Sequence, residues 1–198
     1  MNAIPDLPAP PESRYRKAHQ ELMKALEPSR VLYTWVDAPF GAVFLARTTK
    51  GVCRVSFRRS EDELLSDLER RSLLPERAPA KLERERRQLS EYFQGKRRRF
   101  ELPVDLRFTT EFQRKVLTTA SRIPFGECRR YADVARSAGR PNAQRAVGNA
   151  LGKNPLPIVI PCHRVVASGG GLGGYTGGLD IKRALMGIEG IEIGERKG

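Results

Sequence analysis

Cys162 and His163 are the adjacent pair with the clearest capacity for chemistry. They follow a short apolar stretch over 157–160, expected to be a strand, and three prolines, the last of them Pro161, restrict the backbone that leads to the thiol. A cysteine is a nucleophile in its thiolate form, and His163 and Arg164 beside it can lower its pKa. Rigid placement next to an ionisable partner favours a nucleophile over a buried structural cysteine.

A glycine-rich loop and a carboxylate follow this pair. The loop over 169–178 requires unusual backbone angles, and Tyr175 is its only aromatic residue. Its spacing lacks the Gly-Lys-Ser/Thr ending of a phosphate-binding loop, which favours a wall around a flat ligand. A closing helix over 180–190 places Glu189 near its end, where it either orients His163 as the third member of a relay or lies on the surface.

The elements before Cys162 form a candidate helix-turn-helix. Thr110 with Gln113 predicts a capping box that opens one helix, which ends at Pro124-Phe125-Gly126. A short helix over 131–139 follows, and then another that starts at 141–142 and runs to 154. From the pattern alone, an ordinary packed helix pair is the favoured interpretation.

The second of these two helices is unusually rich in small residues. Ala143, Ala146 and Gly148 lie in it, although a glycine costs about 1 kcal/mol in a helix interior relative to alanine. A slim helix suits close approach to another backbone or to a DNA groove. Arg145 stands among these small neighbours, either reaching into DNA or as a solvated surface arginine.

The first half of the chain is expected to be strands and helices without evident catalytic residues. Residues 1–28 are read as a partly mobile extension with a polar helix over 14–26. Branched and aromatic residues predict strands, with a turn at Lys50-Gly51, and Ser60 with Glu63 predicts a helix cap. The expected elements are strands over 31–36, 42–48, 52–57 and 101–106 and helices over 60–71 and 80–93.

Composition indicates a folded, basic protein. Of its 198 residues 39% are hydrophobic, and the formal net charge of +13 favours a polyanionic partner. We expect a soluble, intracellular chain, because no apolar run is long enough for a membrane helix and the first residues lack a signal-peptide core.

The metal-binding and redox residues are few. Three cysteines and two histidines supply neither a disulfide framework nor a plausible zinc site, so we expect no metal and no cofactor. We interpret Cys53 and Cys128 as structural.

The stretch Pro161-Cys162-His163-Arg164-Val165 resembles the active-site signature of the O6-alkylguanine-DNA alkyltransferases, also called methylated-DNA–protein-cysteine methyltransferases. The resemblance extends from Phe108 to about Ile193, because further motifs occur in family order: FGECRRYADVA, RAVGNALGKNPLPIVIPCHRVV and GYTGGL, followed by a Glu-Gly pair at 189–190. It implies an α/β (α+β) fold. A ribonuclease-H-like strand-and-helix domain over 29–104 would precede a mostly helical domain over 105–198 that carries the helix-turn-helix.

The resemblance also implies roles at the reacting centre. Cys162 would accept the alkyl group, His163 would activate it through a water, and Glu189 would orient His163. Asn154 would be the hinge between the recognition helix and the segment that carries Cys162. Further positions would contact the substrate: Tyr175 at N3 of a flipped guanine, the Thr176 backbone at O6, the Cys162 and Val165 carbonyls at the amino group, and Pro157.

Other matching positions would contact DNA. Arg145 would fill the gap left by the extruded base, and Tyr131 would press on the phosphate of the target nucleotide. Ala143, Ala146 and Gly148 would let the helix enter the minor groove. The implied partner is double-stranded DNA with alkylated bases, bound by a monomer, with cooperative assembly left open.

The resemblance thus implies a DNA repair protein of the cytoplasm or nucleus. It would transfer an alkyl group from O6 of guanine, with O4 of thymine as a further candidate, irreversibly to itself, once per molecule. Three alternatives stay open: a module that binds lesions without transfer, a helix-turn-helix regulator whose cysteine senses alkylation, and, more remotely, a Cys-His hydrolase.

Overall fold

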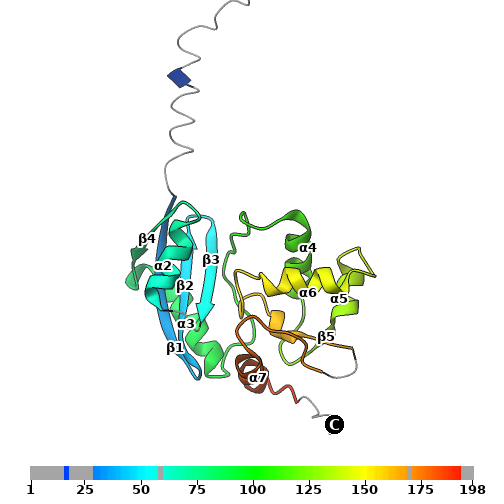
Figure 1. Cartoon of the computed structure of the whole chain (residues 1–198). Coiled ribbons are helices and arrows are strands. Elements are labelled where there is room, and N and C mark those ends of the chain that lie inside the picture. Colours follow the sequence, from blue (N-terminus) through cyan, green and yellow to red (C-terminus); the bar gives the residue numbers. More distant parts are fainter. Residues whose placement is uncertain (1–15, 18–28, 58–59, 169–170, 193–198) are drawn as a thin grey trace, which may run out of the picture.

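The computed structural model describes residues 16–17, 29–57, 60–168 and 171–192. A lobe built on a sheet lies beside a mostly helical lobe, and a single segment after residue 93 connects them (Figure 1). The α+β class expected from the sequence is therefore confirmed. The predicted helix over 14–26 falls almost wholly outside the described residues, as does the rest of the extension apart from residues 16–17.

The first lobe is built on a four-stranded sheet. Strands β1 (Ser29–Ala38), β2 (Gly41–Thr48) and β3 (Gly51–Phe57) form an antiparallel meander, as the branched and aromatic residues predict. Strand β4 (Leu73–Arg77) pairs parallel to β1 and gives the order β3-β2-β1-β4. Strand β4 was not expected, because its central proline argues against a strand, yet proline is tolerated at a sheet edge.

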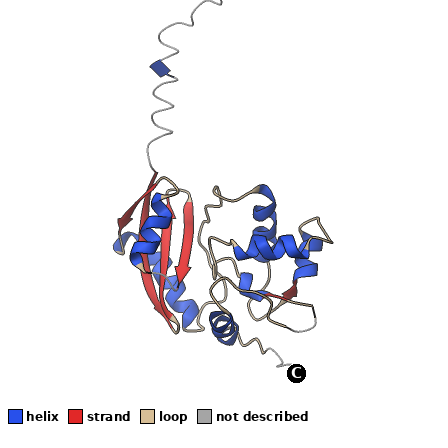
Figure 2. Cartoon of the chain, in the orientation of Figure 1, coloured by secondary structure: helices blue, strands red, loops and turns tan. Residues whose placement is uncertain are grey.

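Helices cover both faces of this sheet (Figure 2). Helix α2 (Glu61–Glu69) begins at the predicted capping box, with Ser60 and Glu63 each bonding the other's backbone N–H, and packs on one face. The 3₁₀ helix η1 (Ala80–Leu82) and helix α3 (Glu83–Phe93) lie on the other face, which also meets the second lobe. Alternation in β2 separates these two cores, with Phe44 in the first and Leu45 in the second.

The segment that leaves the first lobe follows the free edge of β3. The Val52 N–H donates to Pro103 O at 2.8 Å, and the Asp105 N–H donates to Val52 O at 2.8 Å. The strand expected over 101–106 is therefore wrong, since the structure has one isolated bridge there, between Val52 and Val104. Pro103 offers no N–H for a longer ladder, which explains the difference.

The second lobe consists of four helices around Cys162. Helices α4 (Glu111–Ala120), α5 (Tyr131–Ser137) and α6 (Gln144–Gly152) pack on one another, and α7 (Leu179–Ile188) closes the chain. The Thr110 side chain caps α4 by accepting from the Gln113 N–H at 3.2 Å. Two short strands, β5 (Arg129–Arg130) and β6 (Val165–Val166), pair in parallel.

We expect the core shared by the two lobes to dominate stability. Leu45 is 1% exposed there, and its substitution by alanine should lower the free energy of unfolding by about 2–5 kcal/mol through lost burial and an unfilled cavity. Leu74, which is 49% exposed on β4, is the control, and its alanine variant should stay within about 0.5 kcal/mol of the parent. Urea unfolding measures both changes, and equal losses would contradict this placement of the core.

Candidate active site

A tight turn between α6 and Cys162 places the thiol. The strand predicted over 157–160 is wrong: Pro157 and Ile160 form an isolated bridge around a turn, closed by the Ile160 N–H donating to Leu156 O at 2.8 Å. Prolines remove backbone donors that a strand would need. Ile158 adopts φ of 76°, a left-handed conformation that disfavours branched residues and that the surrounding structure must stabilise.

Asn154 ties this turn to the sulfur. Its amide nitrogen donates to Ile160 O at 2.9 Å and to Cys162 Sγ at 3.2 Å, while its carbonyl oxygen accepts from the Leu156 N–H at 2.9 Å. Asn154 stands two residues after the end of α6. A shift of α6 would therefore be transmitted directly to the environment of the thiol.

Cys162, His163 and Arg164 form a 3₁₀ helix, η2 (Cys162–Arg164), with all three side chains buried. Burial raises the pKa of the Cys162 thiol, against the opposing effects of the Asn154 amide and the Lys182 ammonium group. We expected the adjacent His163 and Arg164 to lower this pKa. That expectation is wrong, because the net shift is upward. A buried thiol of this kind needs a base to become a nucleophile.

His163 is held by Glu189. The ring Nε2 lies 2.7 Å from Glu189 Oε1, and neither side chain is exposed, which excludes the alternative of a surface Glu189. A hydrogen bond from Nε2 to a carboxylate leaves Nδ1 as the nitrogen with a free lone pair. Nδ1 is buried and has no hydrogen-bond partner among the described residues.

Further donors converge on the Glu189 carboxylate. The Arg164 Nε donates to Oε2 at 2.8 Å and its Nη2 to Oε1 at 3.0 Å, while Tyr92 from α3 donates its hydroxyl to Oε1 at 2.6 Å. The Gly126 N–H adds a bond to Oε2 at 3.3 Å. Despite burial, the hydrogen bonds from His163, Arg164 and Tyr92 lower the pKa of Glu189 to about 2.

Lys182 lies beneath the same site. Its side chain is fully buried on α7, and its ammonium group donates to Val165 O at 2.6 Å and to Leu172 O. Burial lowers the pKa of Lys182 to about 8. The carbonyl of Val165, a predicted substrate contact, therefore already accepts one hydrogen bond within the protein.

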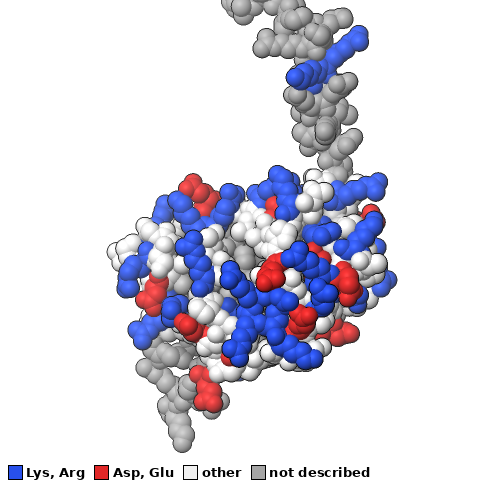
Figure 3. Space-filling model, turned by 180° about the vertical axis from the view of Figure 1, so that it is seen from behind, with Lys and Arg blue, Asp and Glu red and all other residues white. Residues whose placement is uncertain are grey.

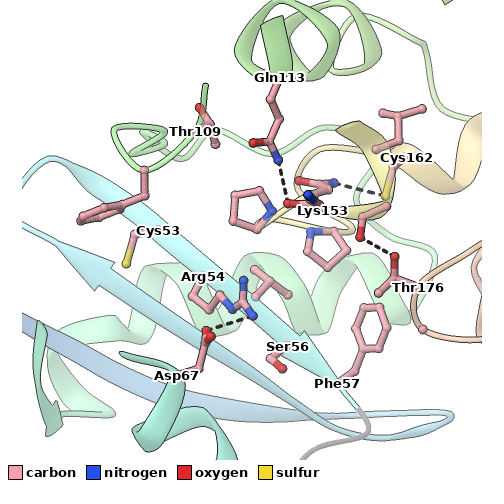
Figure 4. Close-up of a pocket in the computed structure, with 18 of the residues that line it drawn as sticks. Cys53, Arg54, Ser56, Phe57, Asp67, Thr109, Gln113, Lys153, Cys162 and Thr176 are labelled. Atoms are coloured by element: carbon pink, nitrogen blue, oxygen red, sulfur yellow. Dashed lines mark hydrogen bonds and ion pairs between the residues drawn. The ribbon is translucent and has the colours of Figure 1, made fainter. Parts of the chain in front are cut away.

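Two cavities meet at Cys162. One, of about 670 Å³, lies between α5, α6 and the loop after β6, and it brings together predicted residues from distant segments: Tyr131, Arg145, Gly148, Cys162, Tyr175 and Thr176. The other, of about 560 Å³, lies between the lobes and includes Pro157. Figure 4 shows Cys162 on one side of this second cavity and Ser56 and Phe57 of β3 on the other.

The loop before α7 is fixed by contacts with both lobes. Tyr175 stacks on Phe57, with ring centroids 6.1 Å apart. Its buried hydroxyl lies near the Cys162 thiol and has no further hydrogen-bond partner among the described residues. A side chain at Gly177 would overlap the Phe57 ring. The Thr176 hydroxyl donates to Gly152 O at 2.6 Å, and the Tyr131 hydroxyl donates to Gly174 O at 3.3 Å.

The predicted DNA-binding residues line one side of α6. Arg145 and Ala146 are exposed, Gly148 is partly buried, and Ala143 precedes the first turn as the N-cap. Val147 and Ala150 face the core instead. The exposed side of α6 therefore carries Arg145 beside small residues and the polar Gln144 and Asn149, next to the cavity that reaches Cys162.

Two family models together match most of the chain. Residues 31–106 match the 6-O-methylguanine DNA methyltransferase ribonuclease-like domain, and residues 111–191 match the DNA binding domain of the same family. The constitutive methylated-DNA–protein-cysteine methyltransferase of Bacillus subtilis is 40% identical over 170 residues, which is 83% of this chain and 98% of the relative. The chain belongs to this family.

Other family members give the same result. The methylated-DNA–protein-cysteine methyltransferase of Methanosarcina barkeri is 39% identical over 160 residues, 79% of this chain and 96% of the relative. A crystal structure of Mycobacterium tuberculosis OGT in complex with DNA superposes with a TM-score of 0.69 at 35% identity, covering 80% of this chain and 92% of that one.

Two residues of this methyltransferase site were not predicted from the sequence. Tyr92 lies at the end of an amphipathic helix, where an aromatic residue is typical of the core, and its partner Glu189 is 97 residues away. The burial of Lys182 could have been predicted, because it lies among the apolar residues Ile181, Leu185 and Met186 of α7, which are all buried. Arg164, assigned to the thiol, binds Glu189 instead.

The described residues contain no cluster of three or more potential metal ligands. Among the helices of the described part of the chain, none is long and apolar enough to span a membrane.

We predict a characteristic pH dependence for Glu189→Gln. The variant should lose about 3 kcal/mol of unfolding free energy at pH 7, because a buried ion-pair network loses its carboxylate. The pKa of Glu189 is depressed from 4.5 to about 2, so the wild type loses its advantage as the pH falls through that range. Chemical unfolding at pH 7, 4 and 2.5 should therefore show a shrinking difference, and a constant difference would contradict the assignment.

Proposed function

We propose that the chain repairs duplex DNA by moving an alkyl group from O6 of guanine to the sulfur of Cys162. The single observation that carries the proposal is the position of Cys162. It directly precedes His163, which is bonded to Glu189, and it lines both cavities, one of them bordered by the exposed side of α6. The names of the relatives and the DNA-bound Mycobacterium structure point to the same activity.

The transfer is a single displacement. The Cys162 proton passes to His163 Nδ1 through a water, and the resulting thiolate attacks the alkyl carbon. The S–C bond forms as the C–O6 bond breaks, and the electron pair stays on O6, so guanine leaves with its charge stabilised by donors at the ring. The thioether product is stable and no group in the site reverses it, which makes the reaction stoichiometric.

Guanine recognition is assigned to residues of the two cavities that meet at Cys162, together with the Val165 carbonyl. The buried Tyr175 hydroxyl, which lies near the Cys162 thiol, donates to N3, and the Thr176 backbone N–H meets O6. The Cys162 and Val165 carbonyls accept from the amino group, and Pro157 borders the alkyl group. The same contacts can be tested with O4-alkylthymine, which presents an alkylated oxygen in a similar ring position.

Extrusion of the base is assigned to α6 and Tyr131. The O6 substituent of a stacked base cannot reach a buried thiol, so the nucleotide must rotate out, at a cost of roughly a few kcal/mol. Exposed Arg145 fills the vacated space, Tyr131 presses on the phosphate, and Ala143, Ala146 and Gly148 admit the helix to the minor groove.

Electrostatic attraction supports the DNA partner. The net charge is +13, and Lys and Arg side chains gather across the face seen in Figure 3. A monomer suffices, because every group of the relay comes from one chain. The activity requires the compartment that holds the chromosome, which is the cytoplasm in a prokaryote and the nucleus in a eukaryote.

Intact-protein mass spectrometry tests the transfer. After incubation with a duplex that holds one O6-methylguanine, we expect a gain of one methyl group that maps to Cys162. Cys162→Ser should gain nothing, and Cys128→Ser, a change in a half-buried cysteine, should react like the parent. Lesion binding without any mass gain would support a binding module instead, and repeated turnover would support a hydrolase.

The role of Arg145 is tested by comparing two substrates. Arg145→Ala should slow repair of the duplex at least about tenfold, because one strong contact is worth about 1.4 kcal/mol or more, yet react normally with the free alkylated base. Arg114→Ala, which removes an exposed arginine of α4 that borders neither cavity at Cys162, is the charge-matched control. Equal losses on both substrates would reject a role in extrusion.

A further inference from the structure

Tyr92 belongs to the other domain and hydrogen-bonds to the relay. It lies in the last turn of α3, and its side chain is fully buried. Its hydroxyl is 2.6 Å from Glu189 Oε1 and 3.4 Å from His163 Nε2. The Tyr92 hydroxyl therefore lies directly beside the His163–Glu189 hydrogen bond that orients the histidine.

The hydroxyl acts as a donor. Burial and the charge of Glu189 raise the pKa of Tyr92 well above its usual range, so the phenol keeps its proton under all working conditions. It consequently shares Glu189 Oε1 with His163 Nε2 and Arg164 Nη2. Three donors on one oxygen fix its position and reduce the charge that it presents to the imidazole ring.

We propose that Tyr92 is a positioning residue for alkyl transfer, through which the ribonuclease-like domain sets the orientation of Glu189 and the basicity of His163. Its ring is clamped by Phe93, Phe100 and Phe125, with centroid distances of 5.6, 5.3 and 6.3 Å. This clamp keeps the hydroxyl in place. Tyr92 borders neither cavity at Cys162, so it acts on the reaction only through Glu189 and His163.

The sign of the effect follows from the charges around His163. Glu189 faces the ring as an anion, Arg164 and Lys182 face it as cations, and Cys162 precedes it. Burial is the main cause that lowers the pKa of His163, and Glu189 opposes it. Without the Tyr92 hydroxyl, Glu189 accepts one hydrogen bond fewer, and its negative charge stabilises the protonated imidazole of His163 more strongly. The pKa of His163 should therefore rise.

The histidine can be observed directly. The chain has two histidines, so a His19→Gln background leaves one imidazole signal in an NMR titration of the full-length protein. We expect Tyr92→Phe to raise the pKa of that histidine. Tyr33→Phe is the matched control, because the Tyr33 hydroxyl also donates to a glutamate at 2.6 Å, Glu61 Oε1, on the opposite face of the sheet.

Transfer kinetics form the second readout, which rests on the proposed function. Single-turnover rates on the O6-methylguanine duplex should show a maximal rate about tenfold lower in Tyr92→Phe, by analogy with the loss of other second-layer partners. The protein concentration at half-maximal rate should be unchanged. The acid limb of the pH–rate profile should move to higher pH, together with the histidine pKa.

Two results would overturn the proposal: an unchanged histidine titration in Tyr92→Phe, or a rate that falls equally at every pH while the limb stays in place. The second result would reduce Tyr92 to a packing role, and a lower thermal midpoint would accompany it. If the parent protein transfers no alkyl group, the proposed function fails, whereas the NMR comparison still decides the role of Tyr92.

Discussion

The buried carboxylate of Glu189 is the constraint on which the rest of the molecule depends. An anion in a protein interior is costly unless several donors compensate it. Here they come from η2, from the turn before β5, and from α3 of the first lobe. None of these segments is near another in sequence, so the native arrangement of both lobes is required to stabilise one charge.

The same charge decides how the thiol is used. Burial keeps Cys162 protonated, which protects it from indiscriminate electrophiles, while Glu189 holds the next residue, His163, as the base of the proposed relay. The rigid groups of the relay and the exposed residues of α6 therefore lie in different parts of the molecule. The relay lies in the core, whereas Arg145 on the exposed side of α6 faces outward, and Asn154 connects the two.

Much of this arrangement could be predicted from local sequence. The Ser60–Glu63 cap and the meander of β1–β3 are local patterns, and the structure has them where expected. The signature at 161–165 indicated the family, which the family models confirm. The sequence-based predictions failed where a proline or a long-range contact determines the local structure. Pro103 and Pro157 interrupt the two strands that were predicted around them. Pro75 lies in the edge strand β4, which was not predicted because of that proline. No local pattern could place Tyr92 against a residue 97 positions later.

The stack of Phe57 on Tyr175 carries an evolutionary consequence. Gly177 has no room for a side chain beside that ring, and the Val55 N–H donates to Pro155 O at 2.8 Å across the same boundary. The surfaces of the two lobes must therefore match at this boundary. Recombination between diverged members at that point would join surfaces that have drifted apart, and such hybrids would be purged although each half on its own has an intact sequence.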